Sequence, residues 1–482
     1  MQERELRKLK NDRLPPGEME RIKSLIARTK RFAELCSLLP YARGELDADF
    51  EGFLKKHGLS GLREEDMKLL CYPEQEQELQ KILRSPDAVE TVPEPVFRYL
   101  QYQGNKLFAR DHLIKTGCAP SNQRMRRWRE RQINRCLLGL GGVNRSFVHT
   151  PFVVELSQGC SVGCPFCGLG AKGLTAVCRY TQENAELFRG ILSAAHRVIG
   201  DAAGTGTLYL ATEALDDPDY EKFEEDYFRE FGHIPQITTA VPDRDIERTR
   251  RLVHELYEKP SYVHRFSIRS VEMAEKIFEA FTPEELLSVE LIPQFPEAPS
   301  FVNFTVAGSQ IDQVKPEDVP DTDPGTICCI DGFVANMTEK SLRILTPCHM
   351  TEQFPNGISE PCKRFFETAE EFEQVMQEMM EEYMIVDLPE GPLQTYPYLH
   401  RQEKEDGDCV RSEYGGSILV LDKLPKPYAK RVMELLLKGT HDKHEIVHLI
   451  RSEFQDVAAE DIFWYLNQFW KQGYIYDSKL FG

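Results

Sequence analysis

The sequence predicts an α/β protein whose centre is a partial (β/α)6 barrel, with a helical N-terminal region and a small C-terminal winged-helix-like α+β module. Three observations predict this class. Short β-branched or aromatic runs alternate with helical runs between about residues 150 and 306, the pattern of parallel strands joined by helices. Before that stretch no strand-like alternation persists, and from Val410 onward the chain has a separate pattern of strands and helices. We therefore expect four parts, covering residues 1–148, 149–310, 311–400 and 401–482.

The N-terminal region is expected to be helical because its apolar residues recur at heptad-like spacing. These residues are Leu25, Ile26, Phe32, Leu35 and Leu38. Pro93 and Pro95 are expected to mark a break between helices, since proline cannot continue a helix that has already begun.

The barrel is expected to hold six strands, at 152–156, 207–210, 234–241, 262–268, 289–295 and 301–306. Helices are expected between them near 182–199, 219–230, 243–257 and 271–286. The last helical stretch carries Thr282, Pro283 and Glu285 in the arrangement of a capping box.

The extension over residues 311–400 is less regular, and its cysteines are Cys328, Cys329, Cys348 and Cys362. A second capping box, from Thr368 to Glu371, predicts a helix there. The polar and acidic stretch 398–410 is interpreted as a linker. The final module is expected to contain strands at 417–421 and 473–476 and helices at 426–438, 442–454 and 458–471.

Composition excludes some functions and locations. A net charge of −19 argues against general nucleic-acid binding, which depends on neutralising phosphates. No apolar run approaches the ~20 residues that a bilayer-spanning helix needs, so we expect no membrane association. The charged N-terminus lacks the apolar stretch of a signal peptide, and 13 cysteines in so long a chain do not suggest a disulfide scaffold. The cytoplasm is the expected location.

An arginine-rich stretch runs from Arg124 to Arg135, with six arginines against the single acid Glu130. We interpret it as a solvated helix face. The alternative is a site for an acidic partner, for which an acidic peptide is a more natural candidate than nucleic acid.

Three closely spaced cysteines, Cys160, Cys164 and Cys167, have the spacing C-x3-C-x2-C. Three thiolates can hold three irons of a 4Fe–4S cluster and leave the fourth iron open for a cofactor. The motif follows the first predicted strand, and barrel active sites lie at the carboxyl ends of strands. A structural zinc site is the alternative, but zinc takes a fourth ligand and Cys178 falls outside the usual paired spacing.

The run from Gln158 to Gly170, with Phe166 before the third cysteine, resembles the signature of the radical S-adenosylmethionine (SAM) enzymes. The resemblance implies that SAM chelates the open iron and that Phe166 lies near the cofactor. It also implies an electron donor such as flavodoxin or ferredoxin, whose electron is used to cleave SAM to a 5′-deoxyadenosyl radical.

The segment after the second predicted strand resembles the Gly-Gly-Glu-type motif that binds the SAM amino group. Here Ala211 and Thr212 replace the glycines and Glu213 supplies the acid, so the resemblance assigns Thr212 and Glu213 to the cofactor.

A polar face is predicted on the strand 262–268, because Arg265, Ser267 and Arg269 alternate with apolar residues. A buried arginine needs a carboxylate, which SAM could supply, and the alternative is an internal salt bridge. A ribose contact is assigned to Thr238, with a purely structural strand threonine as the alternative.

The C-terminal module has ten basic and ten acidic residues from Val410 onward, so it lacks the basic footprint of a DNA-binding module. It resembles the recognition elements of enzymes that modify ribosomally made peptides, in which a leader peptide adds a strand to the sheet edge. The resemblance assigns Trp464, Trp470 and Tyr474 to the peptide-binding wall, with hydrophobic core as the alternative for each.

Further stretches, at 152–168, 329–337, 345–350 and 355–357, resemble the proteusin-type radical SAM peptide epimerases. The resemblance implies that L-residues of a ribosomally made precursor peptide become D-residues. The 5′-deoxyadenosyl radical removes the Cα hydrogen, and a cysteine thiol returns hydrogen to the opposite face. Cys348 is the first candidate for this donor, followed by Cys362 and Cys329, with an inert buried thiol as the alternative for each.

Two other functions remain open at this point. Cys328, Cys329, Cys348 and Cys362 could hold an auxiliary cluster, as in maturases that form thioethers or other crosslinks. A non-catalytic, zinc-dependent peptide-binding protein is the alternative from another class.

Overall fold

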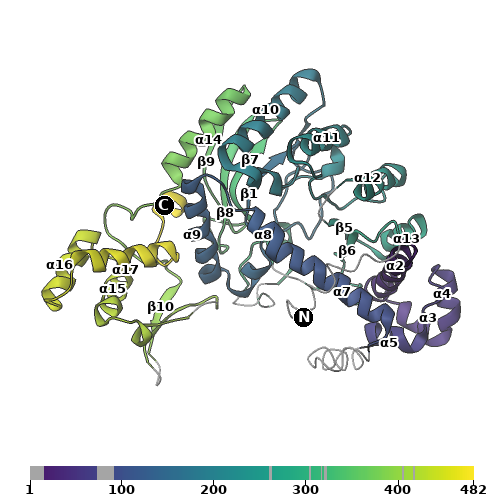
Figure 1. Ribbon diagram of the computed structural model, residues 1–482, viewed down its shortest axis with the longest axis horizontal. Coiled ribbons are helices and arrows are strands. Elements are labelled where there is room, and N and C mark those ends of the chain that lie inside the picture. The colour runs from purple at the N-terminus through teal and green to yellow at the C-terminus, as the bar shows by residue number, and fades with distance from the viewer. Residues whose placement is uncertain are drawn as a thin grey trace. The chain divides into compact units, whose positions relative to one another are not determined.

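The computed structural model describes residues 16–72, 92–259, 263–302, 306–315, 317, 319, 323–403, 407–415 and 418–482. The chain forms two compact units (Figure 1). Unit 1 contains Met1–Ala109 and Thr238–Val302, and unit 2 contains Arg110–Ile237 and Asn303–Gly482. Both units therefore combine segments that are distant in the sequence.

Unit 1 begins with helices: α2 (Pro16–Leu38), α3 (Ala42–Ala48), α4 (Phe50–Lys56), α5 (Glu64–Cys71) and α7 (Glu94–Phe108). The apolar stripe predicted on the first helix is confirmed, because Phe32, Leu35 and Leu38 are fully buried. Pro95 stands in the first turn of α7, where proline's missing N–H costs nothing. The predicted break at the prolines is therefore the start of a helix.

Unit 1 also contains a parallel sheet of β4 (Thr238–Thr239), β5 (His264–Ile268) and β6 (Val289–Pro293). Helices α12 (Ile246–Glu258) and α13 (Val271–Ala280) connect these strands, as the βαβ pattern predicts. The capping-box bonds between Thr282 and Glu285 form, at 2.7 and 3.2 Å. They open a turn rather than a helix, because α13 has already ended at Ala280. Residue 262 lies outside the described residues.

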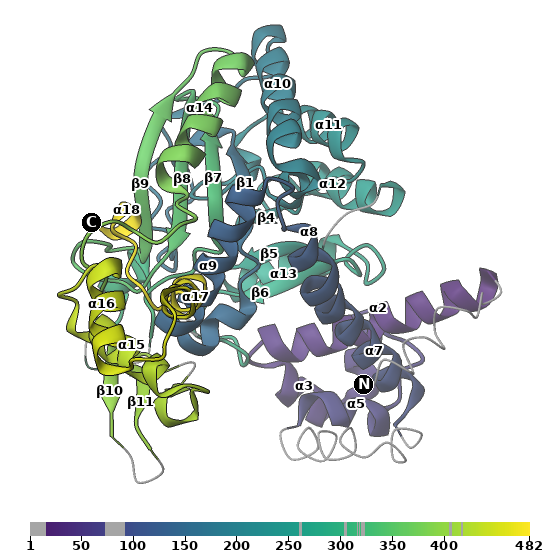
Figure 2. The same ribbon diagram turned by 60° about the vertical axis from the view of Figure 1, so that its left-hand side comes forward.

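Unit 2 is built on a sheet with the order β1-β7-β8-β9. Its strands are β1 (Thr150–Glu155), β7 (Ile330–Asn336), β8 (Ser341–Pro347) and β9 (Ile358–Phe365). The first two are parallel, and β8 and β9 continue the sheet antiparallel. The stretch expected to be irregular, 311–400, thus supplies three strands beside β1. Helices α10 (Gln182–Ile199) and α14 (Ala369–Tyr383) pack side by side (Figures 1 and 2).

Two predicted barrel strands differ from the structure. Residues 207–210 are not a strand, although the Val154 amide donates a 3.1 Å hydrogen bond to the Thr207 carbonyl. At the other position, 301, 302 and 306 are not in strands, and 303–305 lie outside the described residues. The sheets of the described residues do not close on themselves, so the six-stranded partial barrel stays a prediction.

The C-terminal part of unit 2 contains an antiparallel sheet, β10-β11-β12, followed by helices. The strands are β10 (Leu399–Gln402), β11 (Cys409–Ser412) and β12 (Ile418–Val420). The helices are α15 (Pro427–Lys438), α16 (Lys443–Glu453), α17 (Ala459–Lys471) and α18 (Ser478–Phe481). The three longer helices confirm the predicted helical stretches. The strand predicted at 473–476 is only a single bridge between Thr395 and Ile475.

The predicted linker at 398–410 is wrong, because it contains β10 and the start of β11. Only Leu399 of β10 is buried, and His400, Arg401 and Gln402 face solvent. A short strand with a polar solvent face has the composition of a linker, which explains the error. Residues 404–406 and 416–417 lie outside the described residues.

The arginine-rich stretch forms α9 (Gln123–Gly139), and the interpretation as a solvated face is wrong for half of its arginines. Arg129, Arg131 and Arg135 are only 4%, 3% and 2% exposed. The helix packs against both β7 and α17 within unit 2, which accounts for the burial of these side chains. In the part of the chain that the structure describes, no helix is long and apolar enough to cross a bilayer.

Candidate functional site

The three cysteines of the C-x3-C-x2-C motif lie on one loop of unit 2, which follows β1. Two short strands, β2 (Ser157–Gln158) and β3 (Ala176–Val177), pair at the base of the loop. Two backbone hydrogen bonds close it further, from Cys160 N to Lys172 O at 2.9 Å and from Leu174 N to Cys160 O at 3.1 Å. We call residues 159–174 the cysteine loop. Its position after the first strand confirms the place predicted for the motif.

Backbone amides of the cysteine loop point at two of its sulfurs. Val162 N lies 3.4 Å from Cys160 Sγ, and Ala171 N lies 3.4 Å from Cys167 Sγ. Amide donors of this kind stabilise the negative charge of cluster thiolates and tune their potential. All three thiols are half-buried. The donor set therefore suits a 4Fe–4S cluster.

A glycine approaches the backbone of the cysteine loop closely. Ser309 N donates to Cys167 O at 2.9 Å, and this contact brings Gly308 beside the loop. Gly308 has φ +55°, and a Cβ atom there would lie 2.3 Å from the Cys167 carbonyl oxygen. Only glycine fits at this position without moving the loop.

The segment 211–216 contacts the cysteine loop through Asp216. The Asp216 carboxylate accepts hydrogen bonds from Ser161 N at 2.8 Å and from Ser161 Oγ. Glu213 is buried, and its carboxylate accepts from Leu215 N at 3.1 Å at the start of a 3₁₀ turn, Ala214–Asp216. The structure thus brings the segment of Thr212 and Glu213 to the loop of Phe166. Asp216 was missed because nothing in the sequence pairs it with Ser161.

Glu155, at the end of β1, is a second residue that sequence reasoning missed. It is buried and accepts three hydrogen bonds, from Ala211 N at 3.1 Å, Asn336 Nδ2 at 3.2 Å and Arg343 Nη2 at 2.6 Å. It therefore fixes the start of segment 211–216 against the sheet. The sequence did carry one signal for Glu155: an acidic residue at the end of an otherwise apolar strand is buried and needs hydrogen-bond partners.

The other residues assigned to SAM lie in unit 1. Thr238 of β4 pairs with Arg265 of β5, which is exposed, whereas Ser267 is buried. Arg265 and Ser267 were predicted to share one polar face, but only Arg265 is exposed. Parallel strands are commonly covered on both faces, which accounts for the difference. Arg269 Nε is buried and has no hydrogen-bond partner in the part of the chain that the structure describes. An unpartnered buried guanidinium nitrogen suits a carboxylate ligand.

Cys348 directly follows Pro347, the last residue of β8. Its amide donates to Gly357 O at 2.9 Å, and its side chain is buried. Burial raises the pKa of the Cys348 thiol to about 12, so the thiol keeps its proton at neutral pH. A hydrogen-atom donor needs an intact S–H bond rather than a thiolate, and Cys348 meets this requirement.

One turn connects Cys348 with the cysteine loop. The Gly357 carbonyl accepts a hydrogen bond from the Cys348 amide, and the neighbouring Asn356 donates from Nδ2 to Leu169 O at 3.4 Å. A Cβ atom on Gly170 would lie 3.3 Å from Asn356 Oδ1, so the two segments are in contact. The stretch 355–357, which the resemblance singled out, therefore touches both predicted halves of the site.

The two alternative donors lie elsewhere in unit 2. Cys362 stands on β9 opposite Ile344, and burial raises its pKa to about 12. Cys329 packs beside a core cluster of Cys136, Leu140 and Phe147.

The cysteines proposed for an auxiliary cluster do not share one core cluster. Cys328 packs with Val153 and Val334, whereas its neighbour Cys329 packs beside the different cluster named above. The Cys328 thiol nevertheless interacts electrostatically with Cys329 and Cys348, so the auxiliary cluster stays an open alternative.

A buried group of Cys136, His149 and Asp331 has ligand atoms within 4.8 Å of one another, as a metal site would. However, Arg135 Nη2 lies 3.2 Å from Cys136 Sγ, and Arg129 Nε donates to the His149 carbonyl at 2.6 Å. Burial also raises the pKa of Cys136, which keeps it a thiol. Two guanidinium groups already supply positive charge there, so the group is better explained as a hydrogen-bond network.

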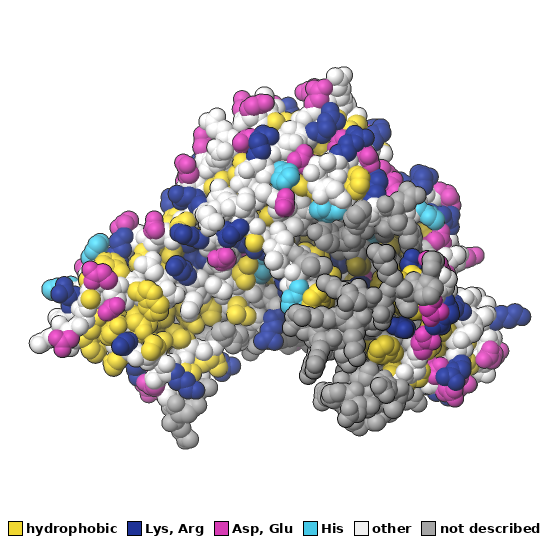
Figure 3. Space-filling view, in the orientation of Figure 1, with side chains coloured by type: hydrophobic (Ala, Val, Ile, Leu, Met, Phe, Trp, Pro, Cys, Tyr) yellow, Lys and Arg dark blue, Asp and Glu magenta, His cyan; other side chains and the backbone are white. Residues whose placement is uncertain are grey.

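The three aromatic residues assigned to peptide binding differ in exposure. Trp464 on α17 is 55% exposed, and Trp470 is 1% exposed. Trp470 donates from Nε1 to Val386 O at 2.9 Å, and Tyr474 is buried near Phe469. Trp470 and Tyr474 therefore belong to the core, the alternative weighed for them. Figure 3 shows apolar side chains gathered over the C-terminal helices.

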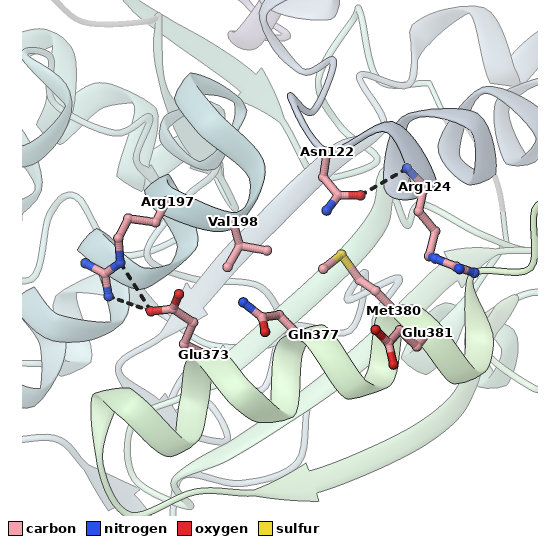
Figure 4. Close-up of a pocket in the computed structure, with 8 residues that line it drawn as sticks. All are labelled: Asn122, Arg124, Arg197, Val198, Glu373, Gln377, Met380 and Glu381. Atoms are coloured by element: carbon pink, nitrogen blue, oxygen red, sulfur yellow. Dashed lines mark hydrogen bonds and ion pairs between the residues drawn. The ribbon is translucent and has the colours of Figure 1, made fainter.

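A cavity of about 350 Å³ lies between the start of α9, the end of α10 and α14 (Figure 4). In it Arg197 pairs with Glu373 at 2.6 Å, and Arg124 Nη1 donates to Met384 O at 3.5 Å. None of its lining residues belongs to the cysteine loop or to the turns described above. We therefore do not place the functional site there.

The chain is similar to the uncharacterized protein y4wI of Sinorhizobium fredii, with 36% identity over 323 residues. The match covers 66% of this chain and 62% of that protein, so the chain spans less than two thirds of its relative's length. Comparison with protein families finds no match. Comparison with solved structures also finds none.

Proposed function

We propose that this protein is a radical SAM peptide epimerase, which converts L-residues to D-residues in a ribosomally made precursor peptide. One observation carries the proposal: the turn of Asn356 and Gly357 contacts both the cysteine loop and Cys348. A loop suited to a 4Fe–4S cluster and a thiol that keeps its hydrogen are the two parts that inversion at Cα requires.

The residues that would hold the cluster are Cys160, Cys164 and Cys167. When bound, a 4Fe–4S cluster and SAM would supply the radical chemistry that removes a hydrogen atom from Cα. Asp216 fixes the cysteine loop through Ser161, and Glu155 fixes the segment that carries Glu213. The protein's own groups therefore prepare the loop before any cofactor arrives.

Cys348 would return the hydrogen atom. Its S–H bond breaks as the new Cα–H bond forms, and a sulfur radical remains on Cys348. One electron from a donor such as flavodoxin or ferredoxin and one proton then restore the thiol. Because burial holds the pKa of Cys348 at about 12, the restored group stays protonated at neutral pH.

The C-terminal module would hold the leader of the precursor peptide. β12 is an edge strand of the sheet, and its Ile418 is exposed. An extended peptide can add a strand to such an edge through backbone hydrogen bonds. The exposed ring of Trp464 offers apolar surface on α17 of the same module.

Co-expression with a candidate precursor peptide in heavy water tests the proposal. We expect D-residues by chiral analysis, each with a deuteron at Cα, and a purified protein with roughly four irons per chain. A product lighter by two hydrogens would instead indicate a crosslink. A colourless, iron-free, zinc-containing protein would overturn the proposal.

A further inference from the structure

Arg135, near the end of α9, is buried and contacts the end of β8, which Cys348 directly follows. Its Nη2 donates to Pro347 O at 2.5 Å and to Thr346 Oγ1 at 2.9 Å. Its Nε donates to Gln132 Oε1 at 2.8 Å. Pro347 directly precedes Cys348, so the guanidinium holds the backbone on the N-terminal side of this cysteine.

Keeping a guanidinium in such a place is costly, because a buried charge loses its hydration. Its compensation is indirect: Thr346 Oγ1 donates in turn to the Asp331 carboxylate, which also bonds His149 Nδ1. The ring of Phe481 lies 4.8 Å from the guanidinium carbon. Rigid placement of the contacted backbone would be the benefit of this arrangement.

We infer that Arg135 is a positioning residue, which fixes the backbone at Pro347 and Cys348 so that the thiol meets the substrate in one orientation. The inference rests on the proposed role of Cys348. Arg135 holds the carbonyl before Cys348, and Gly357 O holds the Cys348 amide at 2.9 Å. Hydrogen bonds therefore hold the backbone carbonyl before Cys348 and the amide of Cys348 itself.

This role needs the planar guanidinium group of arginine, which carries several N–H donors in fixed directions. Its Nη2 reaches two acceptors on β8 while Nε stays bound to α9. A lysine in the same place carries the charge but lacks the planar fork, so it would hold fewer of these acceptors. The charge-conserving variant Arg135→Lys therefore separates geometry from charge.

Arg129 provides a matched control on the same helix. It is also a buried arginine that donates to backbone carbonyls, those of His149 at 2.6 Å and Val148 at 3.1 Å. These acceptors precede β1 rather than Cys348. Arg129→Lys thus alters a second guanidinium of the same network but removes none of the hydrogen bonds to Thr346 or Pro347.

The first experiment uses the full chain without cluster or SAM and measures alkylation of Cys348 by mass spectrometry of its peptides. We expect Arg135→Lys to raise the labelling rate about tenfold over the native protein, because the backbone around Cys348 opens more often. Arg129→Lys is expected to label at nearly the native rate. Equal labelling in all three proteins would overturn the inference.

Thr346→Val covers the case in which Arg135→Lys does not fold. It removes the hydroxyl that links Arg135 to Asp331 and leaves the guanidinium in place. We expect labelling of Cys348 to rise several-fold in this variant too. Native-like labelling in a folded Thr346→Val protein would count against the network as the source of the positioning.

The second experiment uses the active enzyme and measures 5′-deoxyadenosine formed per D-residue. Loss of folded protein lowers 5′-deoxyadenosine and D-residues equally. A misplaced hydrogen donor instead raises the amount of 5′-deoxyadenosine formed per D-residue. We expect an increase of about tenfold for Arg135→Lys and no change for Arg129→Lys. If the native enzyme makes no D-residue, the proposed function is wrong; if it does and the ratio stays constant, the positioning role alone is wrong.

Discussion

The side-chain amide of Asn356 donates a 3.4 Å hydrogen bond to the carbonyl oxygen of Leu169, and this bond joins two residues that are 187 positions apart in the sequence. Leu169 belongs to the cysteine loop, and Asn356 precedes the glycine that binds Cys348. The bond therefore links the proposed site of hydrogen removal to the proposed site of hydrogen return.

Asn356→Ala should weaken this link. We expect D-residue formation to fall about tenfold, because a small displacement between reacting groups is enough to slow transfer. Asn134→Ala is the control, since it also removes an amide that donates to a backbone carbonyl, that of Lys471 at 3.0 Å. Equal rates in the two variants, measured by chiral amino-acid analysis, would contradict the link.

Cys164→Ala should prevent cluster assembly and abolish SAM cleavage, because two thiols cannot replace three cluster ligands. Iron content and 5′-deoxyadenosine formation are the measurements. Cys178→Ala, a buried cysteine outside the cysteine loop, should keep both. A Cys164→Ala protein that still formed 5′-deoxyadenosine would rule out the cluster assignment.

Cys348→Ala should keep SAM cleavage and lose D-residues, because the radical at Cα would have no thiol to quench it. Cys362→Ala, with a thiol whose pKa is also raised to about 12, should retain D-residue formation. Loss of D-residues in Cys362→Ala alone would move the donor to β9.

Alkaline pH should destabilise the folded protein partly through Cys348. Burial raises the pKa of this thiol from 9.0 to about 12, so the folded state holds a proton that the unfolded chain releases. The related stability is complete below about pH 9 and is lost as the pH rises toward 12. Urea unfolding midpoints should therefore fall more steeply with pH in the native protein than in Cys348→Ala. Parallel slopes would contradict the buried thiol.

Trp464→Ala should weaken leader-peptide binding about tenfold while leaving the melting temperature nearly unchanged, because its ring is already exposed. Phe365→Ala is a suitable control, since Phe365 is 66% exposed but lies on β9 outside the module. Titration calorimetry with the leader would measure the affinity of both variants. Undiminished affinity in Trp464→Ala would place the leader elsewhere.

The helices were predictable from the sequence where apolar spacing and caps agree. The helix predicted at 182–199 matches α10, and Thr181 caps it through Asn184 N at 3.2 Å. The three longer C-terminal helices were likewise predicted to within a few residues. Local signals suffice for such elements because each turn depends on residues close in sequence.

Partnerships between distant residues were not predictable. Arg135 looked like a surface residue by composition, and only the packing of α9 shows that it is buried against β8. The Asp216–Ser161 contact and the hairpin at 398–410 were missed for the same reason. Such features depend on which segments meet in three dimensions, and a single sequence carries no local trace of that.

The packing of α9 on the C-terminal segment decides how the proposed recognition module could be transplanted. Arg131 pairs with Asp477 at 2.6 Å and lies 3.7 Å from the ring centroid of Trp470. Gly473 comes so close that an added Cβ would lie 2.6 Å from Arg135 N. A module cut before β10 would leave Trp470 uncovered and Asp477 without its counter-charge. A chimaera that borrows this module must therefore bring α9 with it, and exchange of leader specificity is better attempted by grafting β12 and the exposed face of α17.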